Sequence, residues 1–252
     1  MNTTSRIRLP LYLTPEHPCS YYDDRSARTV FGDPRALPDL EMQTRLAHLG
    51  FRRSGRYIYR PECDACSACR PARIDVHGFR PDRSQRRNLR RNGDLHVSVQ
   101  RPWCDASLLA LYNDYQQWRH PEGQMYAEGT AQYSDFLLAT WSETRYLEMR
   151  EGDKLIGVAV FDWLGDGLSA VYTFYSPATE ARGLGTFAIL QLLELAKRED
   201  LDYVYLGYWL KEHPKMDYKR RFRPLEVLDG TQWRVLGEDP HAGPCGLQSP
   251  RP

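Results

Sequence analysis

The sequence predicts an α/β fold, in which a mixed β-sheet is flanked by helices and preceded by a small cysteine-containing N-terminal subdomain. In the second half of the chain, two strand-like runs are followed by a glycine-containing turn, an amphipathic helix and another strand. The 252 residues allow one large domain or two small ones, and contents of 41% hydrophobic and 27% charged residues are typical of a soluble globular protein. No apolar run is long enough to span a membrane.

Residues 1–94 are expected to form the small subdomain. It begins with an irregular, partly extended segment at 1–13 and a polar turn region at 18–25. A helix at 37–49 ends at Gly50, because glycine is the usual residue just beyond a helix. A hairpin at 51–60 with its turn at Ser54-Gly55, a strand at 74–79 and a helix at 83–91 complete this part.

Residues 95–237 are expected to form the sheet domain. Its predicted elements are a strand at 95–100, helices at 104–118 and 130–141, strands at 145–150, 154–163 and 168–175, a helix at 185–199 and a strand at 203–210. Residues 238–252 are rich in Pro and Gly and are expected to form a flexible tail.

The glycine-containing turn narrows the fold class. Arg182-Gly183-Leu184-Gly185 opens the helix at 185–199, and glycines at a helix N-terminus let backbone N–H groups approach an anion. This pattern after two strands is the phosphate-contacting signature of the acetyltransferase-like (GNAT-type) fold. The alternative is a plain tight turn. We expect Arg182 to contribute to nucleic-acid binding.

An arginine cluster lies on the helix predicted at 83–91. At 3.6 residues per turn, Arg83, Arg86, Arg87, Arg90 and Arg91 fall on one broad face, and Asp82 is the only acidic residue close by. Because the net charge of the chain is only +1, nucleic-acid binding must come from such a local cluster. The pattern predicts an RNA-binding helix; the alternative is a solvated or internally paired face.

The cysteines suggest a metal site. Cys63, Cys66 and Cys69 lie three residues apart, and Cys19 is the best candidate for the fourth ligand that zinc or an iron–sulfur cluster requires. The first twenty residues lack a secretory signal, so we expect a cytoplasmic protein with reduced thiols. Free, buried thiols are the alternative.

A box rich in tyrosine and lysine follows the last predicted strand. It runs from Tyr208 through Lys215 to Tyr218 and Lys219. Tyrosine hydroxyls can position a nucleophile or a leaving oxygen, and lysine can hold a phosphate or a developing oxyanion. The box therefore indicates a catalytic or substrate-binding loop.

These motifs together resemble the arginyltransferase family, in its leucine-transferring bacterial branch. The likeness lies in Pro18-Cys19-Ser20-Tyr21 with Arg25, in residues 59–73 around the three cysteines, in residues 79–92 with the arginine helix, and in residues 206–226. It implies a cytoplasmic enzyme with an acetyltransferase-like fold, in which charged tRNA replaces coenzyme A. The branch transfers leucine from Leu-tRNA to N-terminal Asp or Glu of proteins and so marks them for degradation.

The resemblance suggests roles for single residues. We expect Tyr172, Tyr208, Lys215, Tyr218 and Lys219 to line the aminoacyl–adenosine end, and Arg25 to bind the carboxylate of the acceptor. The aminoacyl ester is already activated, so the chemistry requires no cofactor. Eukaryotic relatives hold a metal centre with two close cysteine pairs; this chain departs from that pattern, which leaves the presence and identity of a metal open.

Three alternatives remain at this level. Arginine could be the donor amino acid, because the pocket walls cannot be assigned from the sequence. A coenzyme A-dependent N-acetyltransferase would use the glycine turn but neither the arginine helix nor the cysteine loop. A non-catalytic, metal-stapled RNA-binding module would use neither the sheet domain nor the Tyr/Lys box. Neither a membrane nor DNA is an expected partner.

Overall fold

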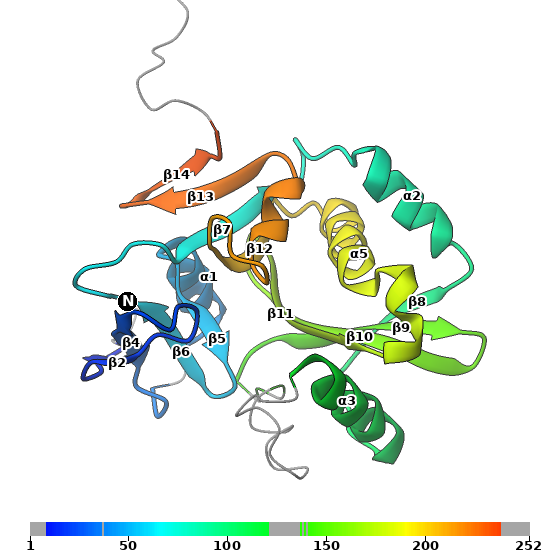
Figure 1. Ribbon diagram of the computed structural model, residues 1–252, viewed down its shortest axis with the longest axis horizontal. Helices are drawn as coiled ribbons and strands as arrows, with labels where there is room; N and C mark the ends of the chain where they lie inside the picture. The colour runs from blue at the N-terminus through cyan, green and yellow to red at the C-terminus, as the bar shows by residue number, and fades with distance from the viewer. Residues whose placement is uncertain (1–8, 37, 121–136, 138, 140, 238–252) are drawn as a thin grey trace, which may run out of the picture.

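The computed structural model describes residues 9–36, 38–120, 137, 139 and 141–237. Its centre is an eight-stranded sheet with the strand order β14-β13-β7-β12-β11-β10-β9-β8 (Figure 1). In chain order these strands are β7 (Arg70–Asp75), β8 (His96–Gln100), β9 (Thr144–Glu151), β10 (Lys154–Trp163), β11 (Gly167–Tyr175), β12 (Tyr203–Trp209), β13 (Leu225–Asp229) and β14 (Gln232–Val235). Only β11 and β12 among these neighbours pair in parallel, so the sheet is mixed.

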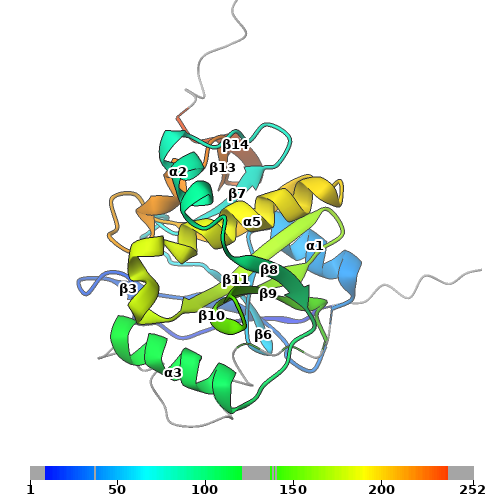
Figure 2. The ribbon, with the colours of Figure 1, turned by 90° about the vertical axis from the view of Figure 1, so that its right-hand side faces the viewer.

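Helices cover both faces of this sheet. The helix α5 (Leu184–Arg198) packs on one face and α3 (Ala106–Arg119) on the other (Figure 2). Alternation along β10 supplies both cores: Phe161 belongs to the cluster under α5, whereas Val158 and Val160 belong to the cluster under α3. The helix α2 (Arg83–Arg91) packs against α5 on its outer side. The predicted α/β class, a mixed sheet flanked by helices, is confirmed.

The N-terminal part forms a second, smaller sheet with the order β1-β4-β6-β5. Its elements are β1 (Leu11–Leu13), β4 (Thr29–Gly32), β5 (Arg52–Ser54) and β6 (Tyr57–Pro61), accompanied by α1 (Leu40–His48) and by the short pair β2 (His17–Pro18) and β3 (Ser26–Ala27). A buried ion pair fastens it to the large sheet: Arg53 Nε lies 2.6 Å from Asp162 Oδ2, and Nη2 lies 3.0 Å from Oδ1.

Most predicted elements have the expected type, and the structure differs from the prediction at three points. The strand expected at 74–79 is β7 at 70–75, because it pairs antiparallel with β12 and β13 and turns away after Val76. The expected domain boundary at residue 94 does not divide the chain between the two sheets. The strand β7 precedes this boundary but lies in the large sheet, between β12 and β13. The strands β13 and β14 and the 3₁₀ helices η1 (Pro177–Arg182) and η2 (Asp217–Arg221) were not predicted.

The expected tail at 238–252 and most of the helix expected at 130–141 lie outside the described residues. Within the described part of the chain, no helix is long and apolar enough to cross a membrane.

Candidate functional site

The arginine helix α2 is positioned by its own first turn and by polar side chains on its inner face. Asp82 and Gln85 form a capping box, with each side chain 2.8 Å from the other residue's backbone nitrogen. On the inner face, Gln85 Nε2 donates to the carbonyl of Arg221 (3.0 Å), and Asn88 Nδ2 donates to that of Gly183 (3.1 Å). This docking turns the opposite face of α2 to solvent.

The outward face of α2 carries the five predicted arginines, Arg83, Arg86, Arg87, Arg90 and Arg91, all of them exposed. None of them forms an ion pair with a carboxylate of the described residues. Arg86 and Arg91 donate only to backbone carbonyls. The internally paired face that the sequence left open is therefore not what the structure contains, and the row of guanidinium groups can meet phosphates.

Arg182 differs from the α2 arginines, because its charge is satisfied within the protein. Its two Nη atoms lie 3.0 and 2.9 Å from the carboxylate of Asp94, and it also pairs with Glu151. The guanidinium of Arg182 lowers the pKa of Asp94. The expected role of Arg182 in nucleic-acid binding has no support in this geometry; the residue ties the η1 turn to the edge of the sheet.

The glycine turn likewise has a packing role. Gly183 has a φ of 66° and begins α5, and a Cβ at this position would lie 2.9 Å from Asn88 Nδ2. The absence of a side chain therefore lets α2 approach the first turn of α5.

Two members of the Tyr/Lys box are buried side by side. Tyr208 is fully buried, and its hydroxyl lies 3.0 Å from the carbonyl of Gly50 and 3.2 Å from that of Tyr59. Lys219, on η2, is 3% exposed and donates from Nζ to the carbonyl of Tyr208. Tyr208 therefore holds the hairpin and Lys219 in place, which corrects the expectation that its side chain lines the substrate.

Burial strongly affects Lys219. Loss of solvent around its ammonium, together with the nearby guanidinium of Arg52, lowers its pKa to about 7. No carboxylate of the described residues forms an ion pair with it. A buried amine near half-protonation at neutral pH is suited to exchange a proton.

Arg52 belongs to this site although the sequence did not predict it. From β5 it reaches across to the large sheet and donates from Nη2 to the carbonyls of Ala170 (2.8 Å) and Val171 (3.4 Å) on β11. On β12 it lies against Gly207, where an added Cβ would overlap the guanidinium. Gly207 was the available signal, because an isolated glycine inside a strand often marks a close approach by another group.

Arg52 lies where the parallel pairing of β11 and β12 ends. The strands β11 and β12 pair in parallel only where Gly167–Ser169 lie beside Tyr203–Tyr205. The pairing of β12 with β7 shifts register between Tyr205 and Gly207. Arg52 spans the two strands just beyond their last pair. It is half-buried and forms no ion pair with a described carboxylate. The structure thus brings two unpaired cations, Arg52 and Lys219, against neighbouring residues of β12.

The other predicted members of the box lie nearer the surface. Lys215 is exposed, and Tyr218 on η2 is 42% exposed. Tyr172, on β11, accepts a hydrogen bond from Gln116 Nε2 (3.3 Å), and its ring lies 6.2 Å from that of Tyr115. Burial raises the pKa of Tyr115 to about 12, with a smaller contribution from Tyr175. Tyr172 therefore lies among aromatic rings that pack with α3.

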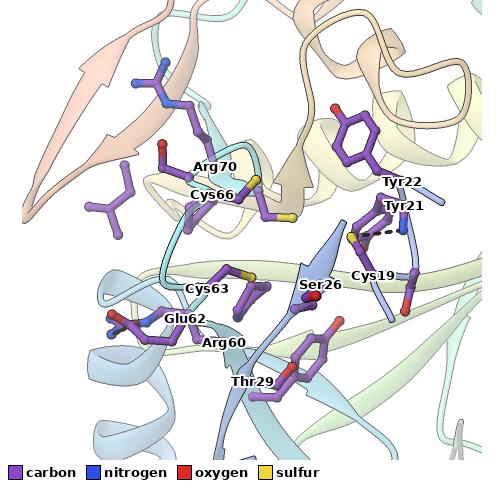
Figure 3. Close-up of a pocket in the computed structure, with 18 of the residues that line it drawn as sticks. Cys19, Tyr21, Tyr22, Ser26, Thr29, Arg60, Glu62, Cys63, Cys66 and Arg70 are labelled. Atoms are coloured by element: carbon purple, nitrogen blue, oxygen red, sulfur yellow. Dashed lines mark hydrogen bonds and ion pairs between the residues drawn. The ribbon is translucent and has the colours of Figure 1, made fainter. Parts of the chain in front are cut away.

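The four predicted metal ligands, Cys19, Cys63, Cys66 and Cys69, line one cavity of about 640 Å³ (Figure 3). Burial, followed by the neighbouring Cys19, raises the pKa of Cys69 to about 12. However, no three His, Cys, Asp or Glu side chains of the described residues are grouped closely enough to hold a metal ion. As arranged here, the thiols do not form a metal cage, and the zinc or iron–sulfur centre stays a prediction from the sequence.

Arg25 contacts two residues that line the cysteine cavity, Tyr22 and Cys66. Its guanidinium stacks 4.1 Å from the ring centroid of Tyr22, lies 3.5 Å from Cys66 Sγ and pairs loosely with Asp24 at 3.7 Å. Its contacts are thus with the cysteine loop, whereas Arg52 is the arginine that lies close to Lys219.

Comparison with protein families identifies the class. The model of the N terminus of arginine-tRNA-protein transferases matches residues 17–87, and the model of the C terminus matches residues 107–229. The first segment holds the cysteine loop, β7 and part of α2, and the second holds the strands from β9 to β13 together with η2. The chain therefore belongs to the class of tRNA-dependent aminoacyltransferases.

Individual relatives refine this assignment. An aspartate/glutamate leucyltransferase from Stenotrophomonas maltophilia K279a is 48% identical over 237 residues, covering 92% of this chain and 94% of the relative. One from Saccharophagus degradans is 48% identical over 231 residues, covering 91% and 98%. The chain belongs to this family, the aspartate/glutamate leucyltransferases, and is an enzyme.

Solved structures resemble the chain less closely. The C-terminal domain of a lysylphosphatidylglycerol synthetase from Agrobacterium fabrum gives a TM-score of 0.46 at 13% identity, covering 66% of this chain and 50% of that one. A GCN5-related glucosamine N-acetyltransferase region of a fungal β-N-acetylglucosaminidase gives 0.40 at 12% identity, covering 76% and 23%.

Proposed function

We propose that this protein transfers leucine from Leu-tRNA to the N-terminal Asp or Glu of acceptor proteins in the cytoplasm, marking them for degradation. The family and its relatives' names support this activity. The structural observation that carries the proposal is the pair of unpaired cations, Arg52 and Lys219, where β11 and β12 part. Two neighbouring cations without an anion are unfavourable in a protein interior, which favours an anionic substrate group at this point.

In this proposal Arg52 binds the side-chain carboxylate of the acceptor's first residue. A guanidinium has a planar fork of donors that suits a carboxylate. Arg52 uses Nη2 for the carbonyls of β11, which leaves its other donors for a ligand. This role replaces the one expected for Arg25.

The reaction then needs alignment and one proton transfer. The neutral α-amine of the acceptor attacks the ester carbonyl carbon, an oxyanion forms, and the C–O bond to the ribose breaks as the amide forms. The nitrogen loses a proton to the neutral form of the Lys219 amine, and the protonated Lys219 then gives that proton to the departing ribose oxygen. An α-amine has a pKa near 8, so a buried amine with a pKa of about 7 is a suitable partner. No cofactor takes part in these steps.

The donor is tested with tRNAs charged separately with leucine and arginine, and the acceptor with peptides that start with Asp, Glu or Lys. We expect labelled leucine to be transferred to the Asp and Glu peptides and not to the Lys peptide. Transfer of arginine alone, or acetylation of the same peptides from acetyl-coenzyme A, would contradict the proposal.

A further inference from the structure

A second cavity, of about 590 Å³, lies beside η2. Its apolar wall comes from Trp209 at the end of β12 and from the β13–β14 region, and its charged residues come from the segments around η2. The lining includes Trp209, Lys211, Arg223, Pro224, Leu225 and Val235.

Two exposed arginines flank a buried phenylalanine at this end of η2. Phe222 is buried, whereas Arg221 and Arg223 are exposed, and Arg223 lines the cavity. Neither forms an ion pair with a carboxylate in the described part of the chain. Lys211 has only the exposed Glu212, at 3.9 Å, so its charge is little reduced.

The cavity is connected to both parts of the proposed site. Trp209 follows Tyr208, whose carbonyl accepts from Lys219, and Arg220 of the cavity is next to Lys219 on η2. On the other side, the carbonyl of Arg221 accepts from Gln85 at the first turn of the arginine helix. The cavity therefore lies along the same chain segment, 209–223, that carries Lys219 and contacts the first turn of α2.

We propose that this cavity binds an unpaired nucleotide near the 3′ end of the tRNA, with the base against the apolar wall and its phosphate on Arg223 and Lys211. An apolar wall with cations at its edge suits a nucleobase that carries a phosphate. The proposal rests on the function proposed above, because it supplies the place where the charged end is guided into the site.

The test compares Arg223→Gln with the control Arg234→Gln. Arg234 is exposed on β14 next to Val235 and is not part of the cavity. Binding of intact tRNA, and of the same tRNA with its unpaired 3′ nucleotides removed, is measured by fluorescence anisotropy at several salt concentrations. We expect Arg223→Gln to lower the affinity for intact tRNA roughly tenfold and to reduce the slope of log affinity against log salt by about 0.7. The affinity for trimmed tRNA should not fall. Arg234→Gln should change neither.

Several outcomes would overturn the proposal. Equal weakening of intact and trimmed tRNA would place Arg223 on the duplex, and unchanged binding of both would remove it from the interface. Binding of a free nucleoside monophosphate, with no difference between the two tRNAs, would assign the cavity to another ligand. A second variant, Val235→Glu, places a carboxylate in the wall and should also weaken intact tRNA alone. This experiment measures binding and not leucine transfer. A smaller difference between the affinities for intact and trimmed tRNA in Arg223→Gln would therefore support the cavity's role even if no leucine transfer were found.

Discussion

The amine of Lys219 donates to the backbone carbonyl of Tyr208 in the interior of the protein, and no carboxylate of the described residues balances its charge. This interaction fixes the amine one residue along β12 from Gly207, the point where Arg52 crosses the strand. A buried cation without a charge partner lowers the free energy of unfolding of the protein. Such a cost is typical of a functional site.

The titration of Lys219 gives a prediction for stability. Its pKa is about 7 in the folded protein and near 10.5 when unfolded, so the burial penalty is complete below about pH 7. Above that pH the unfolded chain binds the additional proton, and stability rises until about pH 10.5. The free energy of unfolding of wild type relative to Lys219→Met should therefore increase by about 2–3 kcal/mol from about pH 7 to about pH 9.

Urea denaturation at several pH values measures this difference. Removal of the hydrogen bond to Tyr208 adds a constant offset, which the comparison across pH cancels. The exposed Lys215→Met serves as the control and should show no such trend. Parallel pH curves for wild type and Lys219→Met would show that the amine keeps an ordinary pKa.

The ion pair between Arg53 and Asp162 is predicted to hold the small sheet on the large one. Asp162→Asn leaves a buried guanidinium without its charge partner and should cost about 3–5 kcal/mol. Glu41→Gln breaks the exposed pair with Arg45 and should cost less than about 0.5 kcal/mol. Similar losses in the two variants, measured by urea denaturation, would be incompatible with this role.

The α2 arginines are expected to contribute to tRNA binding in proportion to the phosphates that they neutralise. Replacing Arg86, Arg87 and Arg90 by Gln should reduce the slope of log affinity against log salt by about 0.9 for each phosphate that is no longer neutralised. Arg182→Gln should leave the slope unchanged and lower the melting temperature, because it breaks the pairs with Asp94 and Glu151. The reverse pattern would restore the sequence-based role of Arg182.

Gly207 provides an independent probe of Arg52. A methyl group at this position would overlap the guanidinium, and the φ of 74° is unfavourable for alanine. Gly207→Ala should therefore displace Arg52 and reduce kcat/KM for an Asp-starting peptide by more than about tenfold. Gly152→Ala, at a positive φ with open space around it, is the control for backbone strain. Equal losses of activity in the two variants would argue against a specific effect on Arg52.

Features that are fixed by residues close together in the chain could be predicted from the sequence. The bounds of α2 were predicted correctly because Asp82 and Gln85 form its capping box within one turn. The η2 segment was not predicted, since its residues show no apolar periodicity and are held by packing against β12 and β13.

The site was harder to predict than the elements. Tyr208 and Tyr218 share a residue type and a motif, yet Tyr208 lies on β12, which is buried along almost its whole length, whereas Tyr218 lies on the exposed side of η2. Arg52 and Lys219 are distant in sequence and meet only because the β5–β6 hairpin folds across the large sheet. Charge pairing of Arg182 with Asp94 is equally non-local and could not be foreseen from the turn itself.

The proposed binding of the acceptor's carboxylate by Arg52 predicts a selectivity for Asp over Asn. With Leu-tRNA as donor, kcat/KM is measured for peptides that start with Asp or with Asn, using wild type, Arg52→Gln and Arg52→Lys, each checked for folding by its melting temperature. We predict that wild type prefers Asp by about a hundredfold or more and that Arg52→Gln loses this preference, with Arg52→Lys in between. If Arg52→Gln lowers both rates equally and keeps the preference for Asp, the carboxylate is bound elsewhere and the proposed site is wrong.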